Sequence, residues 1–117
     1  MNYVILENLH RGTSFEVFRG LRISDNRPII IKRIFSEAPS YEDLYKLKNE
    51  FTILNSQKLY GAVSVLELLD ERTLFLEDTG GISLKAYCNQ NKISLLNFFP
   101  IAIQISNCLN EIHKNNI

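Results

Sequence analysis

Three consecutive isoleucines end in a lysine, Ile29-Ile30-Ile31-Lys32, and Glu50 follows 18 residues later in a segment with helical periodicity. A cation that closes an apolar strand and a carboxylate on the inner edge of a helix are each costly to bury alone. The pattern therefore predicts a strand and a helix that pack together and bring Lys32 and Glu50 into contact. An ion pair of this kind is suited to holding phosphate.

The charge balance limits the kinds of partner that the chain can attract. Thirteen basic and thirteen acidic residues give a formal net charge of zero, so no overall field recruits nucleic acid or an anionic membrane. We expect neither as a partner. No apolar run approaches the roughly 20 residues that span a bilayer, and no charged and apolar leader opens the chain. A cytoplasmic location is expected.

Length and apolar content suit a single domain or a piece of one. The 117 residues are 45% hydrophobic, which is enough for a buried core. Cys88 and Cys108 lack metal-ligand spacing and fall in helical patterns, where a free thiol behaves as a small apolar group. No metal site is expected.

The spacing of apolar residues predicts the order of the secondary structure. Alternation of apolar and polar positions predicts five strands, over residues 3–9, 15–21, 28–35, 62–70 and 73–78. Ser40, with Asp43 three residues later, predicts the start of a helix over residues 40–56. After the break at Gly80-Gly81, a short helix is expected over residues 83–91 and a longer one from Ser94. The predicted fold class is α+β: a five-stranded antiparallel sheet with one packed helix, followed by two helices.

Several segments, read in order, resemble the N-terminal half of a Ser/Thr-type protein kinase domain. They are LHRGTSFEVFRG (9–20), IIIK (29–32), Glu50, LEDTGG (76–81) and IHKNNI (112–117). More narrowly, the chain looks like the kinase-like domain that opens certain large bacterial multidomain sensor histidine kinases. The resemblance implies a kinase N-lobe over residues 1–80 and the first two helices of an incomplete C-lobe over residues 81–117.

The resemblance also implies a site for Mg-ATP. In protein kinases a lysine, held by a helix carboxylate, contacts the α and β phosphates, and Lys32 and Glu50 match those positions. The apolar walls around the adenine would be Val17, Ile30 and Leu76. The hinge whose backbone binds the adenine would be Glu77, Asp78 and Thr79.

The loop that covers the phosphates departs from the family pattern G-x-G-x-x-G. Gly12 keeps the middle glycine, but His10 and Phe15 replace the other two, so reduced affinity for ATP is expected. The bulky Phe15 would either cap the loop against the sheet or obstruct the phosphate path. Arg11 and Arg19 would either help neutralise phosphate or act as solvated charges.

The catalytic loop H-R-D-x-x-x-x-N and the D-F-G motif of kinases do not occur in these residues. The chain therefore holds no expected catalytic residue, and phosphoryl transfer by it alone is not expected. The resemblance implies the ATP-binding lobe of a Ser/Thr protein-kinase-like domain truncated before the catalytic loop, whose natural partner is the rest of that domain. The alternatives are a pseudokinase-like regulatory or interaction module and a small-molecule phosphotransferase that shares the lobe.

The last predicted helix carries more apolar residues than one packed face needs. Its stripe recurs every three or four residues: Phe98, Ala102, Ile105, Leu109 and Ile112. Without a larger lobe to cover this stripe, we expect self-association through residues 95–113.

Overall fold

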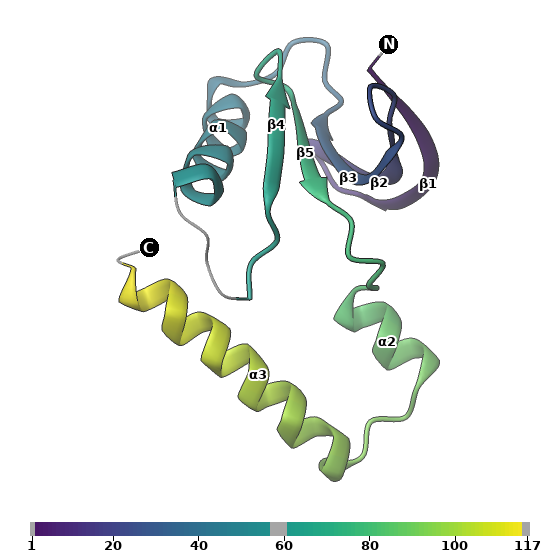
Figure 1. Ribbon diagram of the computed structural model, residues 1–117, viewed down its shortest axis with the longest axis vertical. Coiled ribbons are helices and arrows are strands. Elements are labelled where there is room, and N and C mark those ends of the chain that lie inside the picture. The colour runs from purple at the N-terminus through teal and green to yellow at the C-terminus, as the bar shows by residue number, and fades with distance from the viewer. Residues whose placement is uncertain (1, 57–60, 116–117) are drawn as a thin grey trace. The chain divides into compact units, whose positions relative to one another are not determined.

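The computed structural model describes residues 2–56 and 61–115 and contains five strands and three helices. In chain order they are β1 (Tyr3–Arg11), β2 (Phe15–Arg22), β3 (Arg27–Ile34), α1 (Tyr41–Ser56), β4 (Val65–Leu69), β5 (Thr73–Glu77), α2 (Leu84–Gln90) and α3 (Leu95–Lys114). Figure 1 shows these elements along the chain. The predicted order βββαββαα is confirmed.

All five strands form one antiparallel sheet with the order β1-β2-β3-β5-β4. The α+β class with a five-stranded antiparallel sheet is therefore confirmed. β5 lies inside the sheet, as its continuous apolar run predicts, because both of its faces are covered. Leu74, Phe75 and Leu76 are all buried there.

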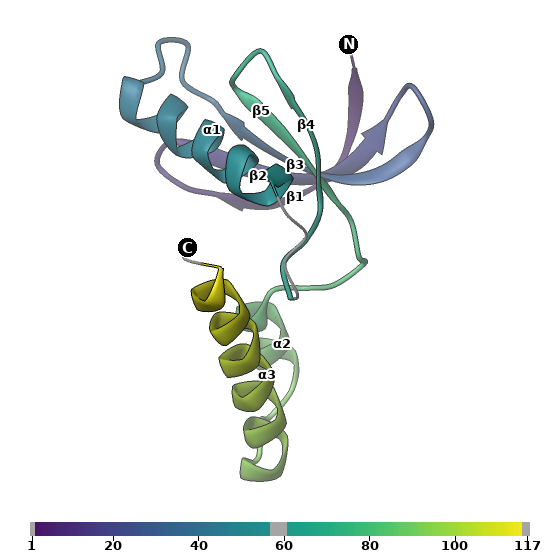
Figure 2. The ribbon, with the colours of Figure 1, turned by 60° about the vertical axis from the view of Figure 1, so that its left-hand side comes forward.

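The sheet carries a core cluster on each face, because successive side chains of a strand point to opposite faces. The helix-side cluster consists of Ile34, Leu47, Leu74 and Leu76. The back cluster consists of Phe18, Ile29, Ile31 and Phe75. Helix α1 covers the first of these faces, contacting β4 and β5, and Figure 2 shows it lying across the sheet.

The back cluster has no helix over it, and the curl of the sheet encloses it instead. Tyr3 of β1 packs its ring edge-on against Phe75 of β5, with centroids 5.5 Å apart. The backbone of β1 also crosses close over Gly20, where an added Cβ would collide with the carbonyl oxygen of Val4. A residue without a side chain is therefore required at Gly20 for β1 to approach β2 so closely.

The β4–β5 hairpin differs in detail from the prediction. β4 is shorter than the predicted strand 62–70, and the turn is centred on Asp70 and Glu71, one residue before the gap of residues 71–72 between the two predicted strands. Asp70 and Glu71 have left-handed φ values of 50° and 59°, and the Arg72 N–H donates to the Leu69 carbonyl at 3.0 Å. The apolar residues Ala62 and Val63 precede the first ladder residue, Val65, so the apolar pattern alone overestimates the strand.

Serine side chains mark the starts of the helices. Ser40 Oγ accepts a hydrogen bond from the Asp43 N–H at 3.1 Å, which confirms the predicted capping contact. Ser83 and Ser94 accept in the same way at the starts of α2 and α3. None of the residues of α2 and α3 is buried. Across residues 2–56 and 61–115, no helix is long and apolar enough to cross a membrane.

The chain forms two compact units, each of which is described by itself. The first spans Met1–Lys58 and Val63–Asp78, and the second spans Leu59–Ala62 and Thr79–Ile117. The expected division lay after residue 80, and the observed division lies after Asp78. The sheet and α1 thus belong to one unit, and α2 and α3 to the other.

Candidate functional site

Lys32 and Glu50 form the predicted ion pair. The Lys32 Nζ on β3 lies 2.8 Å from the Glu50 Oε2 on α1. The two side chains are 30% and 32% exposed, so water reaches both partners. An ammonium has three N–H donors, and Glu50 takes one. Within the described part of the chain, the other two have no hydrogen-bond acceptor, so they remain available to an anion.

Phe15 lies beside this ion pair. Its ring packs against the helix-side cluster, and its centroid is 5.3 Å from the Lys32 Nζ. A ring face attracts a nearby cation, so Phe15 and Glu50 both restrain the lysine. Of the two roles weighed for Phe15, the structure supports packing against the sheet.

The three residues expected to form apolar walls lie on the helix side of the sheet with Lys32. Val17 of β2 is the direct neighbour of Lys32, and Ile30 of β3 is the direct neighbour of Leu76 in β5. Ile30 and Leu76 belong to the helix-side cluster or pack against it. The sheet therefore presents an apolar strip beside the ammonium of Lys32, on the same face.

Gly12 lies in the tight loop between β1 and β2. Its N–H donates to the Phe15 carbonyl at 2.8 Å and so closes the hairpin. An added Cβ would meet only ordinary contacts at 3.5 Å, from the His10 ring and the Phe15 carbonyl. The loop therefore does not require glycine at position 12 for steric reasons, and the amide of Gly12 serves the hairpin.

The end of β5 is held by ion pairs and hydrogen bonds. The Glu77 carboxylate accepts from the Ser64 N–H at 2.9 Å, and the Glu77 N–H donates to the Ser64 carbonyl at 2.9 Å. Asp78 accepts from the Arg19 Nε at 2.9 Å, and the Asp78 side chain is only 7% exposed. Arg19 was expected either to help neutralise phosphate or to be a solvated charge, and its ion pair with Asp78 was not predicted. The position of Arg19 on β2, on the same face as Ile30, could have indicated a partner near the end of β5.

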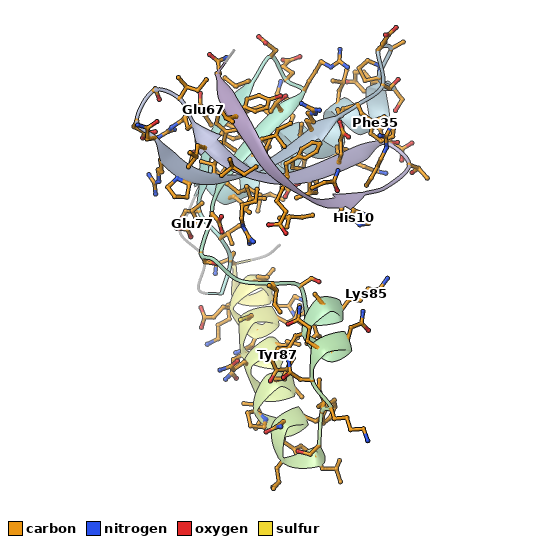
Figure 3. All side chains as sticks on the ribbon, turned by 90° about the vertical axis from the view of Figure 1, so that its right-hand side faces the viewer. His10, Phe35, Glu67, Glu77, Lys85 and Tyr87 are labelled. Atoms are coloured by element: carbon orange, nitrogen blue, oxygen red, sulfur yellow. The ribbon has the colours of Figure 1, made fainter. Side chains whose placement is uncertain are left out.

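Two of the residues named from the sequence, Thr79 and His10, are exposed. Thr79 belongs to the second unit. His10 is exposed on β1, and Figure 3 labels it together with Glu77. Cys88 and Cys108 are free thiols. Among the residues with described positions, no group of three or more His, Cys, Asp or Glu is arranged to hold a metal ion.

Sequence reasoning missed a polar network on the back face. Glu16 is buried, and its Oε1 lies 2.9 Å from the Arg33 Nε. Arg33 also donates from Nη1 to the Tyr3 hydroxyl at 2.9 Å and lies over the Phe18 ring. The alternation along β2 is the signal that could have revealed it, because Glu16 shares the inward positions of Phe18 and Gly20.

The helix face of the sheet thus combines a partly exposed ammonium, a carboxylate that orients it and an adjacent apolar strip. Chemically, the ammonium of this set can donate hydrogen bonds to an anionic group, and the apolar residues beside it can contact a flat apolar group. The chain matches no protein-family model and no curated protein sequence.

Proposed function

We propose that the chain binds Mg-ATP as the ATP-binding lobe of a Ser/Thr protein-kinase-like domain. The ion pair between Lys32 and Glu50 is the observation that carries the proposal. It joins the third strand of a five-stranded antiparallel sheet to the helix that follows, at 2.8 Å. In this reading Glu50 orients Lys32 toward the α and β phosphates, which is the positioning and charge neutralisation that phosphoryl groups need.

The apolar strip formed by Val17, Ile30 and Leu76 supports the proposal that the adenine base of ATP binds beside Lys32. Val17, Ile30 and Leu76 are neighbours of Lys32 or of one another across three strands, so an adenine resting on them would keep its phosphates near the ammonium. Glu77 and Asp78 follow directly as the proposed hinge, together with Thr79. The Arg19–Asp78 pair would hold that segment to β2. The proposed activity of the chain is nucleotide binding and does not include phosphoryl transfer.

Replacing Lys32 with methionine is expected to weaken Mg-ATP binding at least tenfold. Methionine keeps most of the length and the apolar stem of lysine but loses the charged donors, and hydrogen bonds to charged groups contribute about 1.5–3 kcal/mol. Isothermal titration of the 117-residue chain with Mg-ATP, and of the variant under the same conditions, measures the change. Glu50→Gln should weaken binding by a smaller factor, because Lys32 is then present but less firmly oriented.

Lys46→Met is the matched control for that experiment. Lys46 lies on α1, is 59% exposed, and pairs only at the surface with Glu42 at 3.2 Å. Its substitution should leave Mg-ATP binding unchanged. Absence of binding by the native chain would refute the nucleotide proposal. Equal binding by the native chain and Lys32→Met would refute the role assigned to Lys32.

A pseudokinase-like regulatory or interaction module is the second candidate function. It is favoured by the hydrogen bond from the Gly12 N–H to the Phe15 carbonyl, because that amide is not free for phosphate. The ring of Phe15 beside Lys32 also favours this candidate function, because it already restrains the cation. This candidate predicts no change in the thermal unfolding midpoint on addition of Mg-ATP, whereas a nucleotide site raises the midpoint through mass action.

We also propose that two copies of the chain associate through α3. From Leu95 to Asn110 this helix contains no Asp, Glu, Lys, Arg or His. Its exposed apolar side chains are Leu95, Leu96, Phe98, Phe99, Ile103, Ile105 and Leu109. Two such helices can pack together without placing like charges opposite one another, and contiguous exposed apolar side chains favour association.

Sedimentation velocity at about 10–100 μM should therefore show a dimer or a larger species. The double substitution Leu96→Ser with Phe99→Ser removes two exposed apolar groups, 85% and 56% exposed, and should give a monomer. Leu6→Ser on β1, where the leucine is 61% exposed, should behave like the native chain. A native chain that sediments as a monomer throughout this range would contradict the proposal.

A further inference from the structure

A cavity of about 520 Å³ lies on the back of the sheet, away from α1. It is formed between the first residues of β1 and the turn that joins β4 to β5. β1 and β4 are the two edge strands of the sheet. Tyr3 of β1 and Leu69 of β4 nevertheless pack against the same back cluster, so the sheet curls until its edges approach each other. The cavity is the open seam between these edges.

The walls of the cavity are largely apolar. Tyr3, Ile5 and Leu69 contribute side chains of the back face to them, and Ile5 is 40% exposed. Such an exposed apolar side chain leaves surface that a bound molecule would remove from water. The volume falls within the roughly 300–1,000 Å³ typical of small-molecule sites. The walls therefore suit a compact apolar group.

A cation on one side of the cavity is provided by Arg33. Its Nε and Nη1 bind Glu16 and the Tyr3 hydroxyl, whereas its Nη2 has no hydrogen-bond partner among the residues that the structure describes. Burial lowers the pKa of Arg33, but the hydrogen bonds with Tyr3 and Glu16 outweigh burial and raise it overall. The guanidinium therefore stays charged and retains donors for a carboxylate.

An anion on the same cavity is provided by Asp70. This residue is exposed in the left-handed turn, and within residues 2–56 and 61–115 its carboxylate forms no hydrogen bond or ion pair. The hydroxyl of Thr73 also lines the cavity. Opposite charges and an apolar wall in one cavity match a molecule that carries both charges and an apolar group.

We propose that this cavity binds a small zwitterion with an apolar side chain, of which an apolar amino acid is the simplest example. The carboxylate of the ligand pairs with Arg33, its ammonium with Asp70, and its side chain packs against Ile5 and Leu69. The site is independent of the proposed nucleotide site, because Lys32 and Glu50 lie on the other face of the sheet. A ligand of this size and a guanidinium shared with Glu16 imply a dissociation constant of about 1 mM.

An NMR titration of the ¹⁵N-labelled chain with L-phenylalanine, to roughly 20 mM, tests the proposal. Saturable shifts are expected at residues 2–5, at Arg33 and at residues 69–73. Two analogues lack one charge each: 3-phenylpropionate has no ammonium, and 2-phenylethylamine has no carboxylate. Each should bind about tenfold more weakly or worse, because each leaves one charged partner unmatched. Absence of saturable shifts at these residues, or equal binding of either analogue, would overturn the proposal.

The substitution Asp70→Asn removes the proposed partner of the ligand ammonium and leaves Arg33, the proposed partner of the ligand carboxylate, in place. Asparagine tolerates left-handed φ, so the turn should be retained. The variant should bind phenylalanine about tenfold more weakly and bind 3-phenylpropionate as the native chain does. Glu71→Gln is the matched control, since Glu71 is the adjacent carboxylate of the same turn and does not line the cavity. An equal loss of phenylalanine binding in both variants would show a general effect of charge and refute the site.

Discussion

Phe75→Ala is expected to lower the free energy of unfolding by about 3–5 kcal/mol. The ring of Phe75 is fully buried at the centre of the back cluster, where Tyr3 packs against it edge-on at 5.5 Å and 87°. Alanine would leave a cavity that the curled sheet cannot close, because β1, β3 and β5 all border it. The contact that brings the start of β1 to β5 would also be lost. Urea unfolding of the full chain, followed by circular dichroism, measures the loss.

Tyr41→Ala is the control for that experiment. Tyr41 is an aromatic residue of similar size at the start of α1, and it is 85% exposed. Its substitution should change the free energy of unfolding by no more than about 0.5 kcal/mol. A loss below about 1 kcal/mol for Phe75→Ala would contradict the prediction, because it would mean that β1 does not enclose the ring of Phe75 in solution.

The fold could be predicted from the sequence where the signal is local. Alternation gave five strands, and the serine at position 40 with Asp43 marked the start of α1, because these patterns depend on neighbouring residues. The contact between Lys32 and Glu50 could also be predicted, since each charge needs a partner near an apolar core. The position of the β4–β5 turn could not be predicted from the sequence. It depends on left-handed backbone at Asp70 and Glu71, which tolerate that conformation without requiring it.

Features that depend on the curl of the sheet could not be predicted from the sequence. The inward position of Glu16 follows from the alternation along β2, but the hydrogen bond from Arg33 of β3 to the Tyr3 hydroxyl of β1 forms only in the curled sheet. The cavity at the seam requires Tyr3 and Leu69, from opposite edges, to pack on one cluster. Bulges in β1 after Ile5 and Asn8 contribute to this curl, and a period of two does not reveal them. Val17, Ile30 and Leu76 are named only through the resemblance to protein kinases, and the strand register then places each beside Lys32 or beside another of the three.

Arg33→Leu is expected to cost about 3 kcal/mol of stability, because it leaves the buried carboxylate of Glu16 without its main partner. Arg33 provides the Nε at 2.9 Å and also holds the Tyr3 hydroxyl, so the variant loses two hydrogen bonds together. Arg11 lies 3.9 Å from Glu16 but is 63% exposed, and at that distance and exposure it replaces little of the lost interaction. Urea unfolding again gives the free energy.

The double variant Glu16→Leu with Arg33→Leu tests whether the cost comes from a stranded charge. Removing both partners replaces a buried ion pair by apolar groups, which is commonly neutral or stabilising. We therefore expect the double variant to recover most of the stability lost in Arg33→Leu, with the unmatched Tyr3 hydroxyl accounting for a remaining loss of about 1 kcal/mol. A double variant as unstable as Arg33→Leu would instead assign the cost to the packing of the arginine over Phe18, 4.6 Å from the ring centre. The cycle thus distinguishes electrostatic from packing stabilisation of the back face.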